Sequence, residues 1–316
     1  MIGRVVEIAT DGCHLERRHG SLVISKKGVE QDRIPLDDIG VLLCNSRSTT
    51  YTNGLMVELA NRGAATVLCG KNYLPSAWIW PIEGHHIQAK RMRVQIAASR
   101  PLRKRLWQAV VRAKIAHQKS ALDVLGKPSD GFGELARKVR SGDPTNVESQ
   151  AARKYWPLIF GKEFRRQRYG SWPNPALNYG YTLLRATVAR AIVSAGLHPS
   201  IGIHHSNRGN SFCLADDLME PYRPWVDCSV TRLMAAGHTD LTPDSKRVLA
   251  QTLVLDMETA RGTTPLQTCV HRTAQSLAIA YETGRPSFDF PSGIVPSSLI
   301  DVTSASETEE TQEPAC

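Results

Sequence analysis

The chain has 316 residues, of which 41% are hydrophobic and 22% charged, a composition typical of a globular protein with a sizeable core. No apolar run approaches the roughly 18 to 20 residues needed to cross a bilayer, and residues 1–8 alternate like a strand, unlike a signal peptide. The seven cysteines are scattered and never spaced as CxxC, so neither a disulfide framework nor a zinc site is indicated. We therefore expect neither a membrane protein nor a secreted one, and a reducing cytoplasm suits the thiols.

The net charge of +9 is unevenly distributed along the chain. Residues 1–84 are neutral overall, residues 85–170 carry +14 and residues 171–316 carry −5. A basic surplus concentrated in one quarter of a chain is expected of a protein that binds a phosphate-rich polyanion. A set of solvated helix faces is the alternative interpretation.

The first 83 residues predict a small β-rich domain. Short alternating or β-branched runs are separated by turn signals. One stretch, residues 51–61, has apolar residues at helical spacing and stops at Gly63, which predicts a single helix. The predicted strands are residues 4–9, 21–25, 39–44, 66–69 and 77–80.

Helical periodicity dominates after residue 84 and predicts an all-α domain over residues 84–301. Residues 302–316 contain four glutamates, no basic residue and no large apolar one, which predicts a disordered acidic tail. The fold class predicted is therefore a multidomain α+β protein. The predicted helices are residues 87–99, 102–125, 134–140, 147–160, 177–195, 216–234, 244–258 and 265–283.

The helix predicted at residues 102–125 carries a basic stripe. Arg105, Arg112 and Lys119 recur every seven residues, and apolar residues such as Trp107 can pack the opposite side. Such a stripe can follow a phosphate backbone without reading sequence. The DNA contacts predicted in this region are Arg103, Lys104, Arg105 and Arg112.

Glu148 has two possible roles. Asp143-Pro144 looks like an N-cap followed by a proline in the first helical turn, and Thr145-x-x-Glu148 fits a capping box. Acidic residues are favoured in first turns in any case. A structural role at the helix start and a metal-binding or catalytic role therefore both remain open.

Two further places combine residue types that suit chemistry. His204 and His205 are adjacent in a predicted loop, where at most one would face a given site and where a histidine can simply be solvated. Asp217 and Glu220 are three residues apart, so a helix would place both carboxylates on one face. Like charges held together need a neutralising cation, although an exposed acidic helix start is the alternative. Oxygen ligands with one imidazole suit Mg²⁺ or Mn²⁺, and a metal beside a basic surface favours phosphodiester chemistry.

Three blocks of sequence resemble the CRISPR-associated integrase, the catalytic subunit of spacer acquisition in antiviral defence. They are VESQAARKYW at residues 147–156, LNYGYTLL at residues 177–184, and His205 followed by ADDLMEPYRP at residues 215–224. The resemblance extends over the whole chain, because the family also joins an N-terminal β-domain to an α-helical catalytic domain. The short chain and the LADDLMEP motif most resemble the type II subfamily, which works with a single large RNA-guided effector nuclease.

The resemblance implies a site of Mg²⁺ or Mn²⁺ ligands. The family's glutamate, histidine and later acidic residue fall on Glu148, His205 and Glu220, with Asp217 as an additional ligand or partner. The residues expected to contact DNA outside the basic helix are Arg165, Arg166, Asn178 and Tyr181.

The implied reaction is a transesterification. The 3′-hydroxyl of a short DNA duplex attacks a phosphodiester at the repeat boundary of the CRISPR array, and hydrolytic endonuclease activity accompanies it. The resemblance also implies homodimers, with the neutral β-domain as the candidate self-association surface. Two homodimers would flank a dimer of a small ferredoxin-like subunit in a heterohexamer, with the effector nuclease as a further partner. A non-catalytic DNA-binding protein and a structure-specific metal-dependent DNase are the alternatives.

Overall fold

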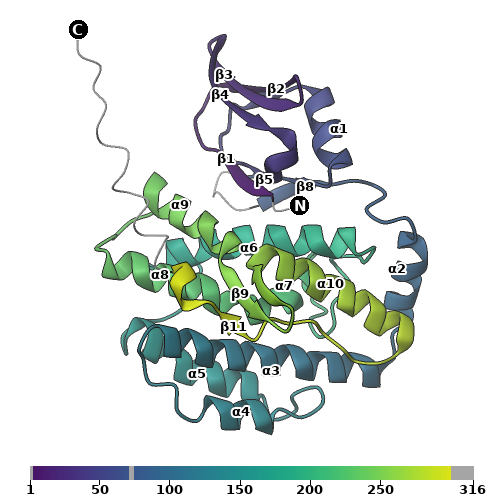
Figure 1. Cartoon of the computed structure of the whole chain (residues 1–316), viewed down its shortest axis with the longest axis vertical. Helices are drawn as coiled ribbons and strands as arrows, with labels where there is room; N and C mark the ends of the chain where they lie inside the picture. The colour runs from purple at the N-terminus through teal and green to yellow at the C-terminus, as the bar shows by residue number, and fades with distance from the viewer. Residues whose placement is uncertain (1–2, 71–74, 300–316) are drawn as a thin grey trace. The chain divides into compact units, whose positions relative to one another are not determined.

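The structure is a computed structural model that describes residues 3–70 and 75–299 (Figure 1). The chain folds into two compact units, each built from three segments. The first unit comprises Met1–Ala109, Thr182–Met219 and Val270–Asp289, and the second comprises Val110–Tyr181, Glu220–Cys269 and Phe290–Cys316. The predicted tail, residues 302–316, lies outside the described residues.

The N-terminal region of the first unit holds two four-stranded sheets. In one, β1 (Arg4–Ile8), β5 (Ile39–Cys44) and β7 (Ala65–Cys69) run parallel, and β8 (Pro75–Ile79) is antiparallel to β7. All six residues of β5 are buried, as expected of an apolar strand in the middle of a sheet. The other sheet has the order β4-β3-β2-β6, formed by Val29–Pro35, Ser21–Lys26, Cys13–Arg18 and Thr50–Tyr51.

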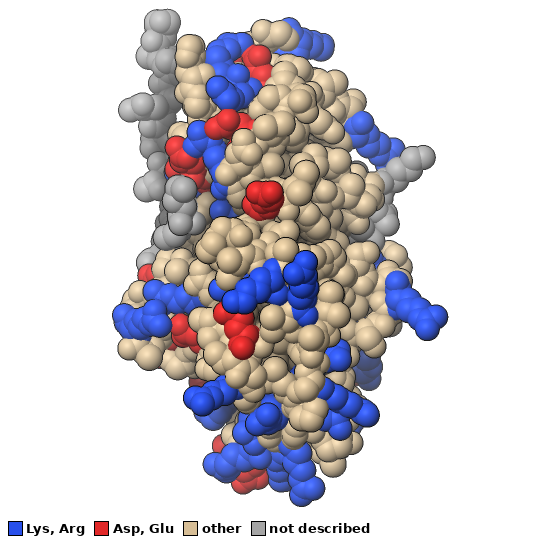
Figure 2. All heavy atoms as spheres, turned by 90° about the vertical axis from the view of Figure 1, so that its right-hand side faces the viewer, with Lys and Arg blue, Asp and Glu red and all other residues tan. Residues whose placement is uncertain are grey.

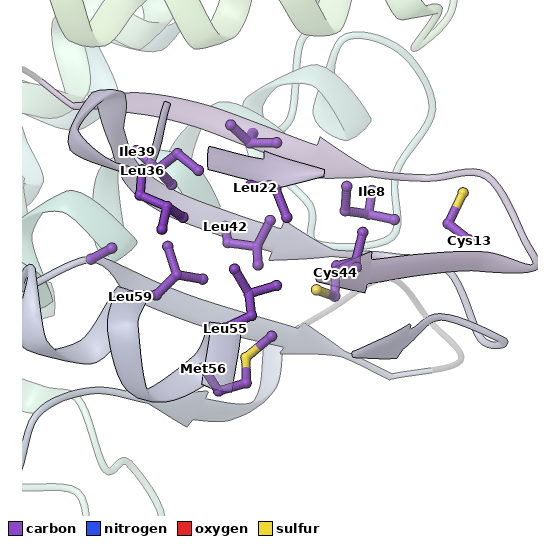
Figure 3. Close-up of a cluster of buried hydrophobic side chains, with 13 residues drawn as sticks. Ile8, Cys13, Leu22, Leu36, Ile39, Leu42, Cys44, Leu55, Met56 and Leu59 are labelled. Atoms are coloured by element: carbon purple, nitrogen blue, oxygen red, sulfur yellow. The ribbon is translucent and has the colours of Figure 1, made fainter. Parts of the chain in front are cut away.

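A helix, α1 (Asn53–Asn61), closes the core of this region. The Thr52 side chain caps its N-terminus by accepting a hydrogen bond from the backbone N–H of Leu55. Figure 3 shows Leu55 and Leu59 of α1 pointing toward Leu42 of β5, and all three side chains are completely buried. Burying these side chains provides the apolar free energy that holds the helix against the sheet.

The predicted strands of this region are confirmed, but β2, β4 and β6 were missed. β4 lies at the edge of its sheet and its side chains are mostly exposed, so it lacks an apolar pattern. Two-residue turns join β2 to β3 at His19-Gly20 and β3 to β4 at Lys27-Gly28, and all four residues have positive φ. Such turns match the right-handed twist of the strands. The two X-Gly dipeptides in the sequence could therefore have predicted the hairpins that contain β2 and β4.

The region after residue 84 is mainly helical, as predicted. Figure 1 labels the helices, and their bounds follow the predicted ranges closely in most cases. No helix within residues 3–70 and 75–299 is long and apolar enough to span a membrane. The helices are α2 (Gln88–Ala97), α3 (Arg100–Val124), α4 (Phe132–Lys138), α5 (Val147–Phe160), α6 (Asn174–Ser194), α7 (Cys213–Met219), α8 (Arg223–Ala235), α9 (Pro243–Gln251) and α10 (Leu266–Thr283).

Two predictions for this region were wrong. The helix predicted at residues 216–234 is interrupted by a 3₁₀ turn, Glu220–Tyr222, because Pro221 and Pro224 cannot donate the backbone hydrogen bonds of a continuous helix. The region is also not all-α. The chain after α9 forms β9 (Asp256–Thr259), which pairs with β10 (Gly262–Pro265) and β11 (Gly293–Ile294) in a small antiparallel sheet. Strands of two to four residues are too short to produce a periodic signal.

Candidate active site

Two carboxylates in the second unit meet at one lysine. The Lys114 Nζ atom lies 2.6 Å from Glu148 Oε1 and 2.6 Å from Glu220 Oε2. The three side chains are only 12%, 23% and 8% exposed, respectively. Burial opposes the charge of Lys114, but Glu220 and Glu148 outweigh it and raise the pKa of the lysine above its ordinary value. The carboxylate pair is therefore assembled around a cation supplied by the chain itself.

The start of α5 leaves the Glu148 side chain available for this contact. Asn146 caps the helix with its side chain, and the Asp143 carboxylate accepts hydrogen bonds from the backbone N–H groups of Val147 (2.9 Å) and Glu148 (3.0 Å). These two residues take the place of the capping box predicted between Thr145 and Glu148, and that prediction was wrong. Because Asp143 and Asn146 already satisfy N-terminal donors, the Glu148 side chain is not needed at the helix start.

Glu220 is positioned by the 3₁₀ turn that interrupts the predicted helix. Its second oxygen, Oε1, lies 3.1 Å from Arg223 Nη2 at the start of α8. The buried ring of His117 lies against the carbonyl oxygens of Pro221 (2.6 Å) and Pro291 (2.8 Å), which fixes the chain directly after Glu220. His117 and Lys114 stand one turn apart on α3, so that helix supports both the glutamate and its counter-cation.

His205 in the first unit is held by Asp217. The Asp217 carboxylate is fully buried, and its Oδ1 atom lies 2.5 Å from His205 Nδ1. Its Oδ2 atom accepts hydrogen bonds from the backbone N–H groups of Ile203 (2.7 Å) and His204 (2.9 Å). A carboxylate oxygen accepts, so Nδ1 carries a hydrogen, and in the neutral ring Nε2 then presents the lone pair. Asp217 therefore organises the loop and selects the tautomer of His205.

The loop that carries His205 allows no bulk at Gly202. A Cβ atom there would lie 2.3 Å from the His205 carbonyl oxygen and 3.0 Å from Asp217 Oδ2. The rings of both adjacent histidines lie against Trp107, although only that of His205 contacts the Asp217 carboxylate. The His204 ring stacks on the buried Trp107 ring with a centroid distance of 4.3 Å, and the two histidine rings are inclined by 87°. The ring that faces the Asp217 carboxylate is thus that of His205.

The prediction that Asp217 and Glu220 share one helix face was wrong. Asp217 belongs to α7 and faces the His205 loop, whereas Glu220 belongs to the following turn and faces Lys114. Among the residues that the structure describes, no group of three or more His, Cys, Asp or Glu side chains could hold a metal ion. Glu148 and Glu220 are brought together in the second unit, while His205 belongs to the first.

Another buried carboxylate belongs to α8, the helix that follows the Glu220 turn. Asp227 of α8 accepts hydrogen bonds from the hydroxyls of Tyr155 (3.0 Å) and Tyr181 (2.5 Å). Burial raises the pKa of Asp227 to about 7, and the two tyrosine hydrogen bonds oppose this shift. The guanidinium groups of Arg166 and Arg223 lie 5.3 and 5.1 Å from the centre of the Tyr181 ring. Arg223 thus links this network to Glu220.

The predicted DNA contacts are in different environments. Tyr181 is only 8% exposed and its hydroxyl is bonded to Asp227, so it lies inside the buried network and not at the surface. Arg166 donates to the side chains of Asn174 and Asn178, which places it at the edge of the same network. The exposed members of the predicted set are Lys104, Arg105, Arg112 and Arg165.

Basic side chains are spread over the helical part of the face seen in Figure 2, where acidic side chains appear in only a few places. Arg103 has a more specific position in the first unit. It lines a cavity of about 440 Å³ together with His205 and Arg208. Positive charge at this cavity is suited to a phosphate group beside the histidine.

Sequence reasoning missed Lys114 and Asp227. Lys114 was one of many cations in a basic run, and nothing in the sequence distinguishes it from those that face solvent. Asp227 follows the acidic block by only a few residues, but its burial depends on tyrosines 46 and 72 positions away. Asp227 stands within the mainly apolar sequence PWVDCSV, and this is the one local feature that could have predicted its burial.

The structure is thus that of an α+β protein with a basic helical region, a carboxylate pair and a carboxylate-held histidine. The family model for CRISPR associated protein Cas1 matches residues 6–261. A CRISPR-associated endonuclease Cas1 from Neisseria meningitidis serogroup C (strain 8013) is 38% identical over 247 residues, which cover 77% of this chain and 81% of that protein. The chain therefore belongs to the Cas1 family.

Solved structures share the fold at lower sequence identity. A casposase bound to integration product superposes with a TM-score of 0.77 at 21% identity, covering 91% of this chain and 93% of that one. A chain of a Cas6-RT-Cas1–Cas2 complex superposes with a TM-score of 0.71 at 18% identity, covering 92% of this chain and 36% of that one. The mixed α+β fold with a strand-rich N-terminal region is thus the fold of these proteins.

Proposed function

We propose that the protein is a metal-dependent DNA integrase and endonuclease of CRISPR adaptation. It inserts short duplex DNA at the repeat boundary of the CRISPR array, where a 3′-hydroxyl attacks a phosphodiester and one such bond replaces another. Membership of the Cas1 family supports the endonuclease activity, and the likeness of fold to a casposase bound to integration product is consistent with the integrase activity. The observation that carries the proposal is the convergence of Glu148 and Glu220 on one cation.

The chemistry of the donor set fits a divalent ion. Glu148 Oε1 and Glu220 Oε2 each lie 2.6 Å from Lys114 Nζ, so a partly buried and a buried carboxylate already share one positive charge. Carboxylate oxygens are the ligands that Mg²⁺ and Mn²⁺ prefer. We assign Glu148, Glu220 and the Nε2 atom of His205 as the ligands. When bound, the ion supplies Lewis-acid activation of the hydroxyl and charge stabilisation at phosphorus.

Asp217 has a different task in this proposal from the one that the sequence suggested. Its carboxylate contacts the backbone of Ile203 and His204 and the ring of His205, so we assign it as a positioning residue and not as a ligand. It keeps the hydrogen on Nδ1 and thereby leaves Nε2 of His205 able to bind a cation. A hydrogen-bonded carboxylate behind a ligating histidine also raises the basicity of the ring.

The basic residues hold the DNA in the proposal. Arg103 faces a phosphate near His205, and Lys104, Arg105, Arg112 and Arg165 contact the duplex backbone from exposed positions. The partners are a second copy of the chain and the small ferredoxin-like adaptation subunit in a heterohexamer, with the large effector nuclease as a further partner. The Cas6-RT-Cas1–Cas2 complex supports the pairing of a protein of this fold with Cas2.

Glu148→Ala tests the proposal against a non-catalytic DNA-binding protein. With the small partner, a labelled pre-spacer duplex, an array plasmid and Mn²⁺, we expect the wild type to transfer label into the plasmid. Glu148→Ala should lose the transfer and keep DNA affinity, and the exposed Glu134→Ala on α4 should behave as the wild type. Unchanged transfer by Glu148→Ala would contradict the assignment. Products that are only shortened would identify a structure-specific DNase, because integration lengthens a target strand.

A further inference from the structure

Lys114 occupies the position that gives the carboxylate pair its charge balance. Its ammonium lies between Glu148 Oε1 and Glu220 Oε2, while Arg223 lies on the opposite oxygen of Glu220. Two negative and two positive charges are thus gathered where little solvent reaches. Without Lys114 the two carboxylates would repel each other in a region that little solvent reaches. The lysine therefore keeps the pair assembled in the absence of any other cation.

The atoms that bind the lysine are atoms that a divalent ion would use. Ligand oxygens lie about 2.0 to 2.2 Å from Mg²⁺ or Mn²⁺, so an ion bound to the same two oxygens would be in close contact with an ammonium 2.6 Å from each of them. Two cations so close repel strongly. The ion and the ammonium therefore exclude each other at these oxygens.

Lys114 can vacate this position more easily than most buried cations. An ammonium is a compact charge on a flexible four-carbon stem, and no rigid bidentate geometry fixes it. The side chain is 12% exposed, so it is not completely enclosed. Arg223, whose planar guanidinium also lies over the Tyr181 ring, is held on two sides.

We infer that Lys114 is a built-in counter-cation that a divalent ion must displace, so that this lysine lowers the metal affinity of a site that it keeps preassembled. The inference rests on the proposed function, because it takes Glu148 and Glu220 as metal ligands. Lys114 would control metal binding without taking part in the reaction itself. The consequence is that metal affinity and metal-free stability change in opposite directions when the lysine is removed.

Lys114→Met tests this inference without any assay of activity. Titration of Mn²⁺ into the full-length protein, followed by the electron paramagnetic resonance signal of free Mn²⁺, should show affinity at least about 10-fold tighter than in the wild type. The metal-free variant should unfold at a lower temperature, and Mn²⁺ should raise its midpoint more than that of the wild type. Lys119→Met on the same helix is the control, because Lys119 is half-exposed and pairs with Asp123 one turn away.

The outcomes separate this inference from the proposed function. Suppose that the wild type binds Mn²⁺, that Glu148→Gln does not, and that Lys114→Met binds it no tighter than the wild type. The inferred displacement of Lys114 is then refuted, while the proposed metal site is supported. If neither wild type nor Lys114→Met binds Mn²⁺, the metal site itself fails and the inference fails with it. Lys114→Gln gives the same comparison if Lys114→Met does not fold. Lys114→Arg keeps the charge and adds a rigid fork that is harder to displace, so it should bind Mn²⁺ no tighter than the wild type.

Discussion

Asp217→Asn should disable His205 without altering the shape of the loop. The carboxylate accepts two short backbone hydrogen bonds at Oδ2, from Ile203 and His204, and contacts His205 at Oδ1. An asparagine has one acceptor oxygen. Keeping that oxygen on the backbone donors turns its NH₂ group toward His205 Nδ1, which can accept only if the ring moves its hydrogen to Nε2. The lone pair that we assign to a metal ion would then be lost.

The size of the effect follows from these contacts. The variant loses the charged acceptor for His205 and weakens two backbone bonds in a fully buried position, and hydrogen bonds to charged groups contribute about 1.5 to 3 kcal/mol each. Allowing for the amide bonds that replace them, we expect the free energy of unfolding to fall by about 2 to 4 kcal/mol. Removing such a partner of a ligating histidine should weaken Mn²⁺ binding roughly 10- to 100-fold.

Nitrogen-15 chemical shifts of the His205 ring report the tautomer directly, and urea unfolding reports the stability. Mn²⁺ titration and strand transfer complete the measurement. Asp244→Asn is the control, because Asp244 is exposed and pairs with Arg247 on its own helix. A hydrogen that stays on Nδ1 in Asp217→Asn, together with wild-type stability, would refute the reasoning.

Two further predictions concern charge elsewhere in the protein. Burial raises the pKa of Asp227 to about 7 from 3.8, so its contribution to stability is complete below about pH 4 and is lost as the pH rises to about 7. Asp227→Asn removes this dependence, so its free energy of unfolding should increase relative to that of the wild type between about pH 4 and 7. Parallel pH profiles of stability for the two proteins would contradict a raised pKa of Asp227. Reversing Arg103, Lys104 and Arg105 to glutamate should weaken DNA binding and flatten its salt dependence, because fewer counterions are released. Anisotropy titrations at several salt concentrations check this, and a wild-type slope would show that the three side chains only face solvent.

Patterns of a few consecutive residues were enough to identify most elements. Apolar periodicity found the long helices, and α5 has the predicted bounds because Asn146 caps it and Asp143 accepts hydrogen bonds from its first two backbone N–H groups. The β-rich start was also predicted, although edge strand β4 was missed since its side chains face solvent. Prolines ended α7 earlier than periodicity suggested, and β9 replaced the end of a predicted helix. Local propensity cannot report pairing between short strands, because that pairing is made by distant backbone.

The sequence by itself determined the family, the helical and strand-rich regions and the basic stretch, and it singled out Glu148, Glu220 and His205 as candidate site residues. Tertiary structure alone decided what these side chains touch. Lys114, on α3, meets carboxylates 34 and 106 positions later, and Asp217 turns to a loop rather than toward Glu220. The reason is physical. Charge, burial and hydrogen-bond partners depend on distances in space, and a sequence specifies them only once the chain has folded.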